Sequence, residues 1–108
     1  MLDDLDDAAL DALPFGVVCL DEDGKVLRMN RTESEKSGIQ RWRAVGREYF
    51  RDVAPLPTNR ALAEHIAAFA HGGAPASFPY TFHRRAGHDA TRIELRRESG
   101  RVYLVIYR

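Results

Sequence analysis

Apolar residues recur every three or four positions at the start of the chain: Leu2, Leu5, Ala9 and Leu13. This spacing is typical of an amphipathic helix, whose apolar stripe lies along one side. We therefore expect a short N-terminal helix, or cap, over residues 1–13 that docks its leucine stripe on another surface. Pro14 ends this helix, because proline has no backbone N–H and clashes with the preceding turn. Residues 14–108 make up the main domain.

Two segments at the start of the main domain predict a β-hairpin. Residues 15–20 form an apolar run, and residues 25–30 alternate between apolar and polar side chains. Between them, Asp21-Glu22-Asp23-Gly24 is typical of a tight turn, because Gly24 can adopt a positive φ.

Three further strands are expected toward the C-terminus: residues 77–84, 90–97 and 102–107. The turns between them are Ala86-Gly87 and Ser99-Gly100. The alternation within 90–97 predicts one buried and one solvated face. The last strand is apolar on both faces and should lie at the centre of the sheet, whereas Pro79 places the first of the three at an edge.

The segment between the two groups of strands predicts helices. Residues 30–46 are polar, with Asn30 and Thr32 as candidate caps, and should form two or three short helices. A longer helix should follow Asn59 and carry one apolar face before Gly72-Gly73 ends it: Leu62, Ile66 and Phe69. This order of elements predicts an α+β domain with one five-stranded antiparallel sheet, short helices on one face and the N-terminal helix.

Composition limits what such a domain can do. The chain has 108 residues, enough for one core, and its 16 basic residues balance 16 acidic ones. No overall field attracts it to nucleic acid or to a membrane surface, and its longest apolar run, Val102 to Tyr107, is far below the ~20 residues of a membrane span. The first 24 residues hold eight acids and no base, unlike a signal peptide. We therefore expect a cytoplasmic protein.

Four local motifs resemble the PAS domains of the photoactive yellow protein family, and the similarity runs from about residue 10 to residue 108. They are Leu-Pro-Phe-Gly at 13–16, Leu-Asp-Glu-Asp-Gly at 20–24, the segment 46–55 with its Asp-Val-Ala-Pro ending, and Phe-Pro-Tyr-Thr-Phe at 78–82. The resemblance implies a PAS fold and a sensory role. In that family a cysteine directly after the Asp-Val-Ala-Pro motif carries a p-coumaroyl thioester, whose phenolate is held by a Tyr and a Glu.

This chain departs from the family at the chromophore. Leu56 stands where the thioester cysteine is expected, and a leucine side chain has no nucleophile. Cys19, the single cysteine, lies in the first predicted strand, where we expect a small buried core residue. We therefore expect no covalent cofactor.

Matching the remaining positions places Met29 at the family's Tyr, Glu33 at its Glu, Ser37 at a supporting Thr and Ile39 at a shielding Arg. The resemblance thus implies a pocket formed by Met29, Asn30, Glu33, Ser37, Ile39, Phe50, Leu56 and Phe82. This pocket is more apolar than the family's but keeps one acid, which favours a small apolar or phenolic ligand held without a covalent bond. The alternative is that Glu33 is solvated or pairs with Arg31 or Lys36.

Other chemistry has weaker support. His65 is the candidate haem ligand, but it lies about one turn later than the usual position, so haem is not favoured. The four histidines show no metal-ligand spacing, and no Gly-x-Ser-x-Gly elbow or phosphate-binding glycine loop is present, so we expect no enzyme activity. Trp42 and Tyr49 are either exposed anchors for a partner or residues of the core and pocket wall.

The sequence predicts a sensory or signalling PAS domain. It would act by binding a small ligand, by homodimerisation or partner docking through the sheet and the N-terminal helix, or by both. A haem-based gas or redox sensor and a protein-interaction module without a ligand remain the alternatives.

Overall fold

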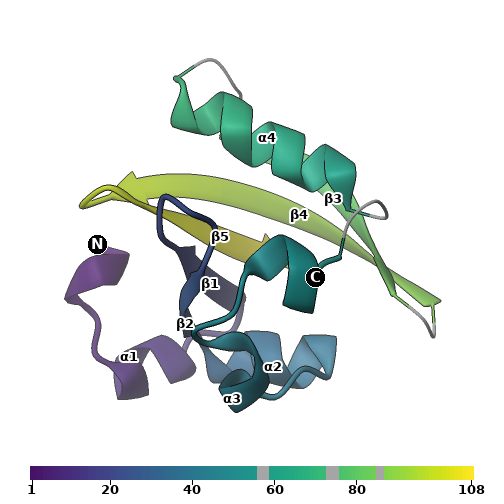
Figure 1. Cartoon of the computed structure of the whole chain (residues 1–108). Coiled ribbons are helices and arrows are strands. Elements are labelled where there is room, and N and C mark those ends of the chain that lie inside the picture. The colour runs from purple at the N-terminus through teal and green to yellow at the C-terminus, as the bar shows by residue number, and fades with distance from the viewer. Residues whose placement is uncertain (56–58, 73–75, 85–86) are drawn as a thin grey trace.

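The structure, a computed structural model, describes residues 1–55, 59–72, 76–84 and 87–108. Figure 1 shows one twisted sheet with helices packed on both of its faces. The strands are β1 (Gly16–Leu20), β2 (Val26–Met29), β3 (Ser77–Arg84), β4 (Gly87–Glu98) and β5 (Arg101–Tyr107). The helical elements are η1 (Leu2–Asp4), α1 (Asp7–Asp11), α2 (Arg31–Ser37), α3 (Arg41–Ala44), η2 (Tyr49–Val53) and α4 (Arg60–Ala70).

The five strands form one antiparallel sheet in the order β2-β1-β5-β4-β3. This confirms the predicted sheet, with β5 in the centre and the Pro79 strand, β3, at an edge. Ile93 and Leu95 are buried, as the alternation in β4 predicted. The β4–β5 turn has a positive φ at both Ser99 (54°) and Gly100 (76°), which matches the right-handed twist of the strands. Ala86, in the other predicted turn, lies outside the described residues.

The N-terminal segment is not the single helix that was expected. It forms η1 and α1, separated by Leu5 in an extended conformation. Asp6 starts the second helix, because its side chain accepts a hydrogen bond from the backbone N–H of Ala9 at 2.8 Å. The predicted stripe is retained only in part. Leu2 is buried and Leu5 and Leu13 pack beside it, whereas Ala9 is exposed and Leu10 is the buried residue of α1.

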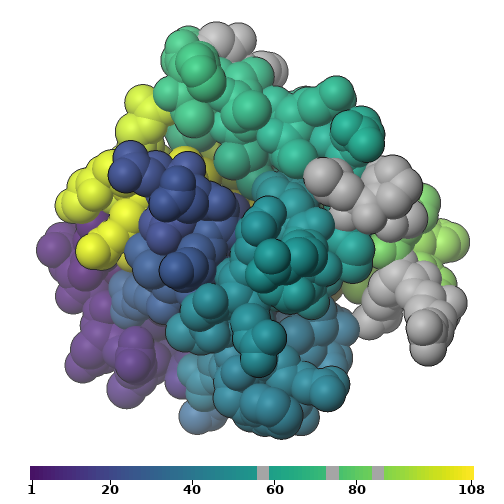
Figure 2. All heavy atoms as spheres, in the orientation of Figure 1, coloured from purple at the N-terminus to yellow at the C-terminus, as the bar shows by residue number. Residues whose placement is uncertain are grey.

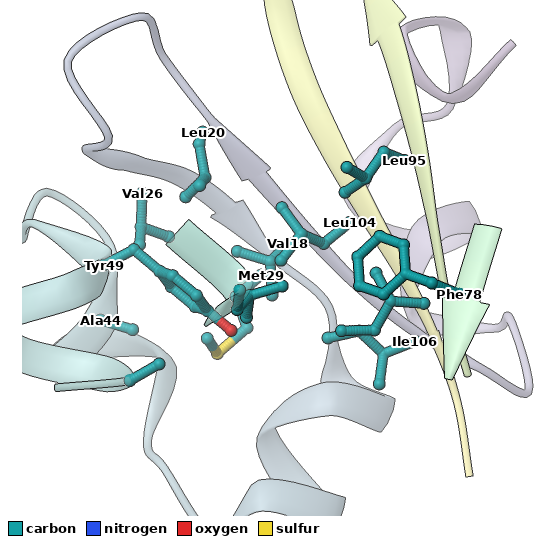
Figure 3. Close-up of a cluster of buried hydrophobic side chains, with 13 residues drawn as sticks. Val18, Leu20, Val26, Met29, Ala44, Tyr49, Phe78, Leu95, Leu104 and Ile106 are labelled. Atoms are coloured by element: carbon teal, nitrogen blue, oxygen red, sulfur yellow. The ribbon is translucent and has the colours of Figure 1, made fainter. Parts of the chain in front are cut away.

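The two faces of the sheet carry separate apolar clusters. The larger cluster lies between the sheet and the helices that follow β2, and Figure 3 shows Tyr49 and Met29 side by side within it. The smaller cluster lies on the opposite face: Leu2, Leu10, Val17, Cys19, Tyr103 and Val105. Leu2 and Leu10 are at most 5% exposed there. The predicted docking of the leucine stripe thus occurs on the chain's own sheet, and these two leucines offer no surface to a partner, contrary to the expected role of this segment.

Helix α4 covers the larger cluster with the predicted face. Leu62 is fully buried, and Ile66 and Phe69 pack beside it. Asn59 is the residue before the helix, but its side chain makes no capping bond and instead accepts one from the Tyr80 hydroxyl at 2.7 Å. Within the described residues, no helix combines the length and the apolar composition that crossing a bilayer requires.

Candidate functional site

A cavity of about 130 Å³ lies where α2, η2 and the ends of β3, β4 and β5 meet. Its apolar wall consists of Ile39, Tyr49, Val53, Ala54 and Phe82. Its polar wall consists of Glu33, Ser37, Asn59, His83, Asp89 and Arg108. A mostly apolar hollow with a few converging polar groups is the usual composition of a small-molecule site.

Glu33 and Arg108 form an ion pair on the wall of this cavity. Arg108 Nη1 donates to Glu33 Oε1 at 2.6 Å, and Nη2 donates to Oε2 at 3.3 Å, which is the two-bond geometry of a strong guanidinium–carboxylate pair. The Glu33 side chain is 5% exposed and that of Arg108 is 17% exposed. Glu33 therefore points inward, and its partner is neither Arg31 nor Lys36.

Two backbone features position the Glu33 carboxylate. Asn30 caps α2 by accepting from the Glu33 N–H at 3.1 Å, which places Glu33 in the first turn. Gly16 in β1 then leaves room for the carboxylate, because a Cβ at this position would lie 2.2 Å from Glu33 Oε1. The close approach of α2 to β1 thus depends on the absence of a side chain at Gly16.

Burial dominates the electrostatics of the site. The pKa of Glu33 is raised because burial penalises its charged form, which outweighs the opposing effect of Arg108, and nearby Asp89 adds to the rise. Burial works against the charge of Arg108 as well, but the hydrogen bonds and charge of Glu33 raise the pKa of Arg108 overall. The pKa of Tyr49 is raised well above its usual range by complete burial.

The structure brings together part of the predicted pocket. Glu33, Ser37, Ile39 and Phe82 line the cavity. Among the described residues, Met29, Asn30 and Phe50 are not part of its lining, and Leu56 lies outside the described residues.

Asn30 has a structural task that explains its position. Its side-chain oxygen accepts from the backbone N–H groups of Val17 and Glu33, and its amide donates to the carbonyls of Leu10 and Phe15. Because these four bonds use its carbonyl and both amide hydrogens, the buried side chain ties β1, α1 and α2 together rather than facing a ligand. Met29 is 3% exposed and belongs to the larger apolar cluster, and Phe50 packs at the margin of that cluster.

Sequence reasoning missed several polar residues of the cavity. Arg108, Asp89 and Asn59 were not among the predicted site residues. Arg108 could have been suspected from the arginine-rich C-terminal segment, but nothing local indicated which arginine faces inward. The sequence left open whether Trp42 and Tyr49 are exposed anchors for a partner or residues of the core and pocket wall. Tyr49 is in the cavity wall, whereas Trp42 is 74% exposed.

The remaining candidates lie away from the cavity. The His65 ring stacks on Phe78 with centroids 3.9 Å apart, so this contact occupies one face of the imidazole. Cys19 is buried, and burial raises the pKa of its thiol. In the described part of the chain, no three His, Cys, Asp or Glu side chains gather where they could bind a metal ion.

Comparison with known proteins gives a consistent result. A family model described as PAS fold matches residues 10–108. The photoactive yellow protein of Rhodothalassium salexigens is 30% identical over 95 residues, which cover 87% of this chain and 76% of that protein. The photoactive yellow protein domain of the sensor histidine kinase Ppr from Rhodospirillum centenum has a TM-score of 0.85 at 28% identity, covering 98% of this chain and 96% of the other.

A more distant structure has the same fold. The PAS domain of the RpfR quorum-sensing receptor from Cronobacter turicensis has a TM-score of 0.73 at 17% identity, over 88% of this chain and 93% of the other. It was solved in complex with BDSF and in complex with C12:0.

Proposed function

The chain belongs to the PAS family and is a relative of the photoactive yellow proteins, and from this premise we propose that it is a sensory domain that binds one small aromatic ligand without a covalent bond. The observation that carries the proposal is the buried pair of Glu33 and Arg108 on the wall of a cavity that also has an apolar wall. An ion pair with this little solvent contact costs desolvation energy, and charged groups retained in such places are often functional.

The size of the cavity supports a ligand with a single ring. An engineered protein cavity of about 150 Å³ binds benzene, and the cavity here measures about 130 Å³. A long acyl chain such as the C12:0 bound by the RpfR domain would need the cavity to open further. A phenol therefore fits the available volume better than a fatty acid.

The polar wall supports a ligand that donates a hydrogen bond. A phenolic hydroxyl can donate to a Glu33 carboxylate oxygen while Arg108 holds the carboxylate in place, because each oxygen has a second lone pair. Ile39 and Phe82 would contact the ring on its apolar sides. Occupancy would favour the conformations that pack on the ligand, and the sheet would carry this population shift to a signalling partner. No thioester is part of the proposal, because Leu56 has no sulfur.

Two probes of similar size test the proposal. We expect p-cresol to raise the melting temperature of the protein by several degrees and toluene to raise it less, because toluene lacks the hydroxyl. Glu33→Ala should abolish the difference between the probes. Glu35→Ala is the matched control, since Glu35 lies on the same helix with its side chain exposed. An absorption spectrum and native mass spectrometry of freshly purified protein would identify a ligand that co-purifies.

Three results of these binding experiments would have different consequences for the proposal. If neither probe binds and no small molecule co-purifies, the cavity is a packing defect of the core and the ligand proposal fails. If both probes bind equally in the wild type, the cavity is apolar in function and Glu33 has no role in recognition. A strong visible band on addition of hemin that His65→Ala removes would instead support the haem alternative.

Self-association is the second part of the proposed function. The observation that favours it is a group of exposed apolar side chains at α3 and β2, among them Trp42, which is 74% exposed. A domain that lacks enzyme activity, as the sequence predicts for this one, must pass its signal on by contact with another protein. A second copy of the chain is the simplest partner.

A further inference from the structure

Exposed apolar side chains are concentrated on one face of the molecule. Five large hydrophobic residues of the described chain are exposed: Met1, Leu27, Trp42, Val45 and Tyr107. Three of them belong to α3, the residue after it, and the edge strand β2. Leu27 and Val45 line one surface hollow together, and Trp42 lines a neighbouring one. We call Leu27, Trp42 and Val45 the α3 patch.

Basic residues lie on one side of the α3 patch. Arg43 and Arg47 are exposed and line the same hollow as Trp42. The guanidinium of Arg43 lies 5.4 Å from the centre of the Trp42 ring, a cation–π contact that holds the charge at the surface. This side of the face can therefore receive carboxylates.

Acidic residues lie on the other side. Asp4, Asp6 and Asp7 are exposed in η1, before α1 and at its first position. Asp7 lines the same hollow as Leu27 and Val45; it lies 3.5 Å from Arg28 Nη2, but its side chain is 91% exposed, so this surface pair leaves the carboxylate accessible. An ion pair between Asp11 and Arg41, at 2.8 Å, fixes α1 beside α3. Figures 1 and 2 show the purple N-terminal segment and the blue-green α2–α3 region next to each other on the surface. The face thus runs from an acidic edge, across an apolar centre, to a basic edge.

We propose that two copies of this chain pair through this face in a two-fold arrangement, with the acidic edge of each copy on the basic edge of the other and the two α3 patches between them. A two-fold axis places the same surface of both copies in contact, so it requires a surface that complements itself. This inference rests on the self-association part of the proposed function and is independent of its ligand part.

Charge complementarity favours a second copy over another partner. A purely acidic protein would be attracted to Arg43 and Arg47 but repelled by the aspartates of the acidic edge, and a purely basic one would meet the reverse. The chain itself supplies both signs side by side, and its total charge is zero, so two copies do not repel each other as a whole. Because the charges are exposed, the pairing is screened by salt and weakens as the salt concentration rises.

Charge reversal tests this pairing in solution. In sedimentation velocity at low salt, the wild type should sediment as a dimer, and Asp4→Lys/Asp7→Lys and Arg43→Glu/Arg47→Glu should each be monomeric. An equimolar mixture of the two variants should recover the dimer, because every contact between an acidic and a basic edge is restored with the signs exchanged. A surface change that only damaged the fold could not be rescued by mixing.

A matched control separates local from global charge effects. Glu64→Lys combined with Ala61→Lys and Ala68→Lys makes the same change in net charge as Asp4→Lys/Asp7→Lys, but at exposed positions of α4, which Figure 1 shows at the opposite end of the molecule from α3. This variant should remain a dimer. Trp42 is the chain's single tryptophan, so its emission should shift to shorter wavelength with rising protein concentration in the wild type and the control, but not in the two monomeric variants.

Two results would overturn the inference in distinguishable ways. A wild-type dimer that persists in both charge variants, with Trp42 emission independent of concentration, would mean that self-association occurs through another surface. A wild type that stays monomeric at millimolar concentration would contradict both this face and the self-association part of the proposed function. Ligand binding by the cavity would be unaffected in either case.

Discussion

The Glu33 carboxylate and the Arg108 guanidinium meet through two hydrogen bonds although the residues are 75 positions apart. The pair joins the first turn of α2 to the residue that follows β5. It therefore couples the cavity wall to the end of the central strand, and any ligand that contacts Glu33 also contacts this connection. Arg108 is held further by Asp89, whose Oδ2 lies 3.8 Å from Arg108 Nε.

Removing Arg108 should destabilise the fold. Arg108→Ala leaves the Glu33 carboxyl buried without its cation, and breaking a buried pair on one side costs about 3 kcal/mol of unfolding free energy. Urea unfolding measures the loss. Arg96→Ala is the control, because Arg96 is exposed and its partner Glu94 is partly exposed, and ion pairs at the surface contribute below about 1 kcal/mol. Equal losses in both variants would show that Arg108 acts as a surface residue.

The pH dependence of stability should reveal the protonation of Glu33. Because burial raises the pKa of Glu33, the folded chain keeps a proton at pH values where the unfolded chain has lost it. The stabilisation from that proton is complete below the unfolded pKa and is lost as the pH rises through the higher folded pKa. Relative to Glu33→Gln, which mimics the neutral acid, the wild type should therefore lose unfolding free energy as the pH rises from the unfolded pKa of the carboxyl group through its higher folded pKa. A relative gain would show that pairing with Arg108 outweighs burial.

The fold could be predicted because its signals are local. Alternation in β4 indicated that Ile93 and Leu95 are buried, and Pro79 marked β3 as an edge strand, since each signal depends on neighbours along the chain. The break in the N-terminal helix also had a local signal, the capping residue Asp6, but the leucine period concealed it.

The site was predicted less completely because its contacts are distant in sequence. The resemblance placed Glu33 in the pocket. Its partner Arg108 lies beyond the last strand, where no periodic pattern of apolar residues indicates which way a side chain faces. Asn30 shows the opposite error. A polar residue beside a pocket was interpreted as a ligand contact, whereas its hydrogen-bonding groups are used by four backbone groups that only the folded chain brings together.

A side chain at position 16 should disturb Glu33 directly. The Cβ of Gly16→Ala would lie 2.2 Å from Glu33 Oε1 and 3.2 Å from its Cβ, so the carboxyl must move. Overpacking of this kind costs about 1–3 kcal/mol. A double-mutant cycle with Glu33→Ala isolates the contact, because the cost of Gly16→Ala should fall sharply once the Glu33 side chain is gone. An unchanged cost would place the strain in the backbone of β1.

Cys19 should report on the N-terminal segment. It is buried with Leu10 in the smaller apolar cluster, and its raised pKa reduces the reactive thiolate further. Thiol labelling of the native protein should therefore be slow. Leu10→Ala removes a side chain that is 2% exposed and should accelerate labelling strongly, with a loss of about 3 kcal/mol in unfolding free energy. Glu64→Ala, at an exposed position of α4, should change neither quantity. Fast labelling of the wild type would mean that this cluster opens readily.

Filling the cavity should abolish ligand binding while preserving the fold. Ala54 lines the cavity and is 4% exposed, so the larger side chain of Ala54→Leu would occupy the space that a ring needs. Because the cavity is next to the new side chain, the variant should avoid most of the strain that a close-packed site would cause. The melting temperature without ligand should stay within a few degrees of the wild-type value, and the shift caused by p-cresol should disappear.

Ala67→Leu is the control for this variant, because it adds the same group at an exposed position of α4 and should keep the shift caused by p-cresol. A full p-cresol response in Ala54→Leu would mean that the ligand binds elsewhere on the chain.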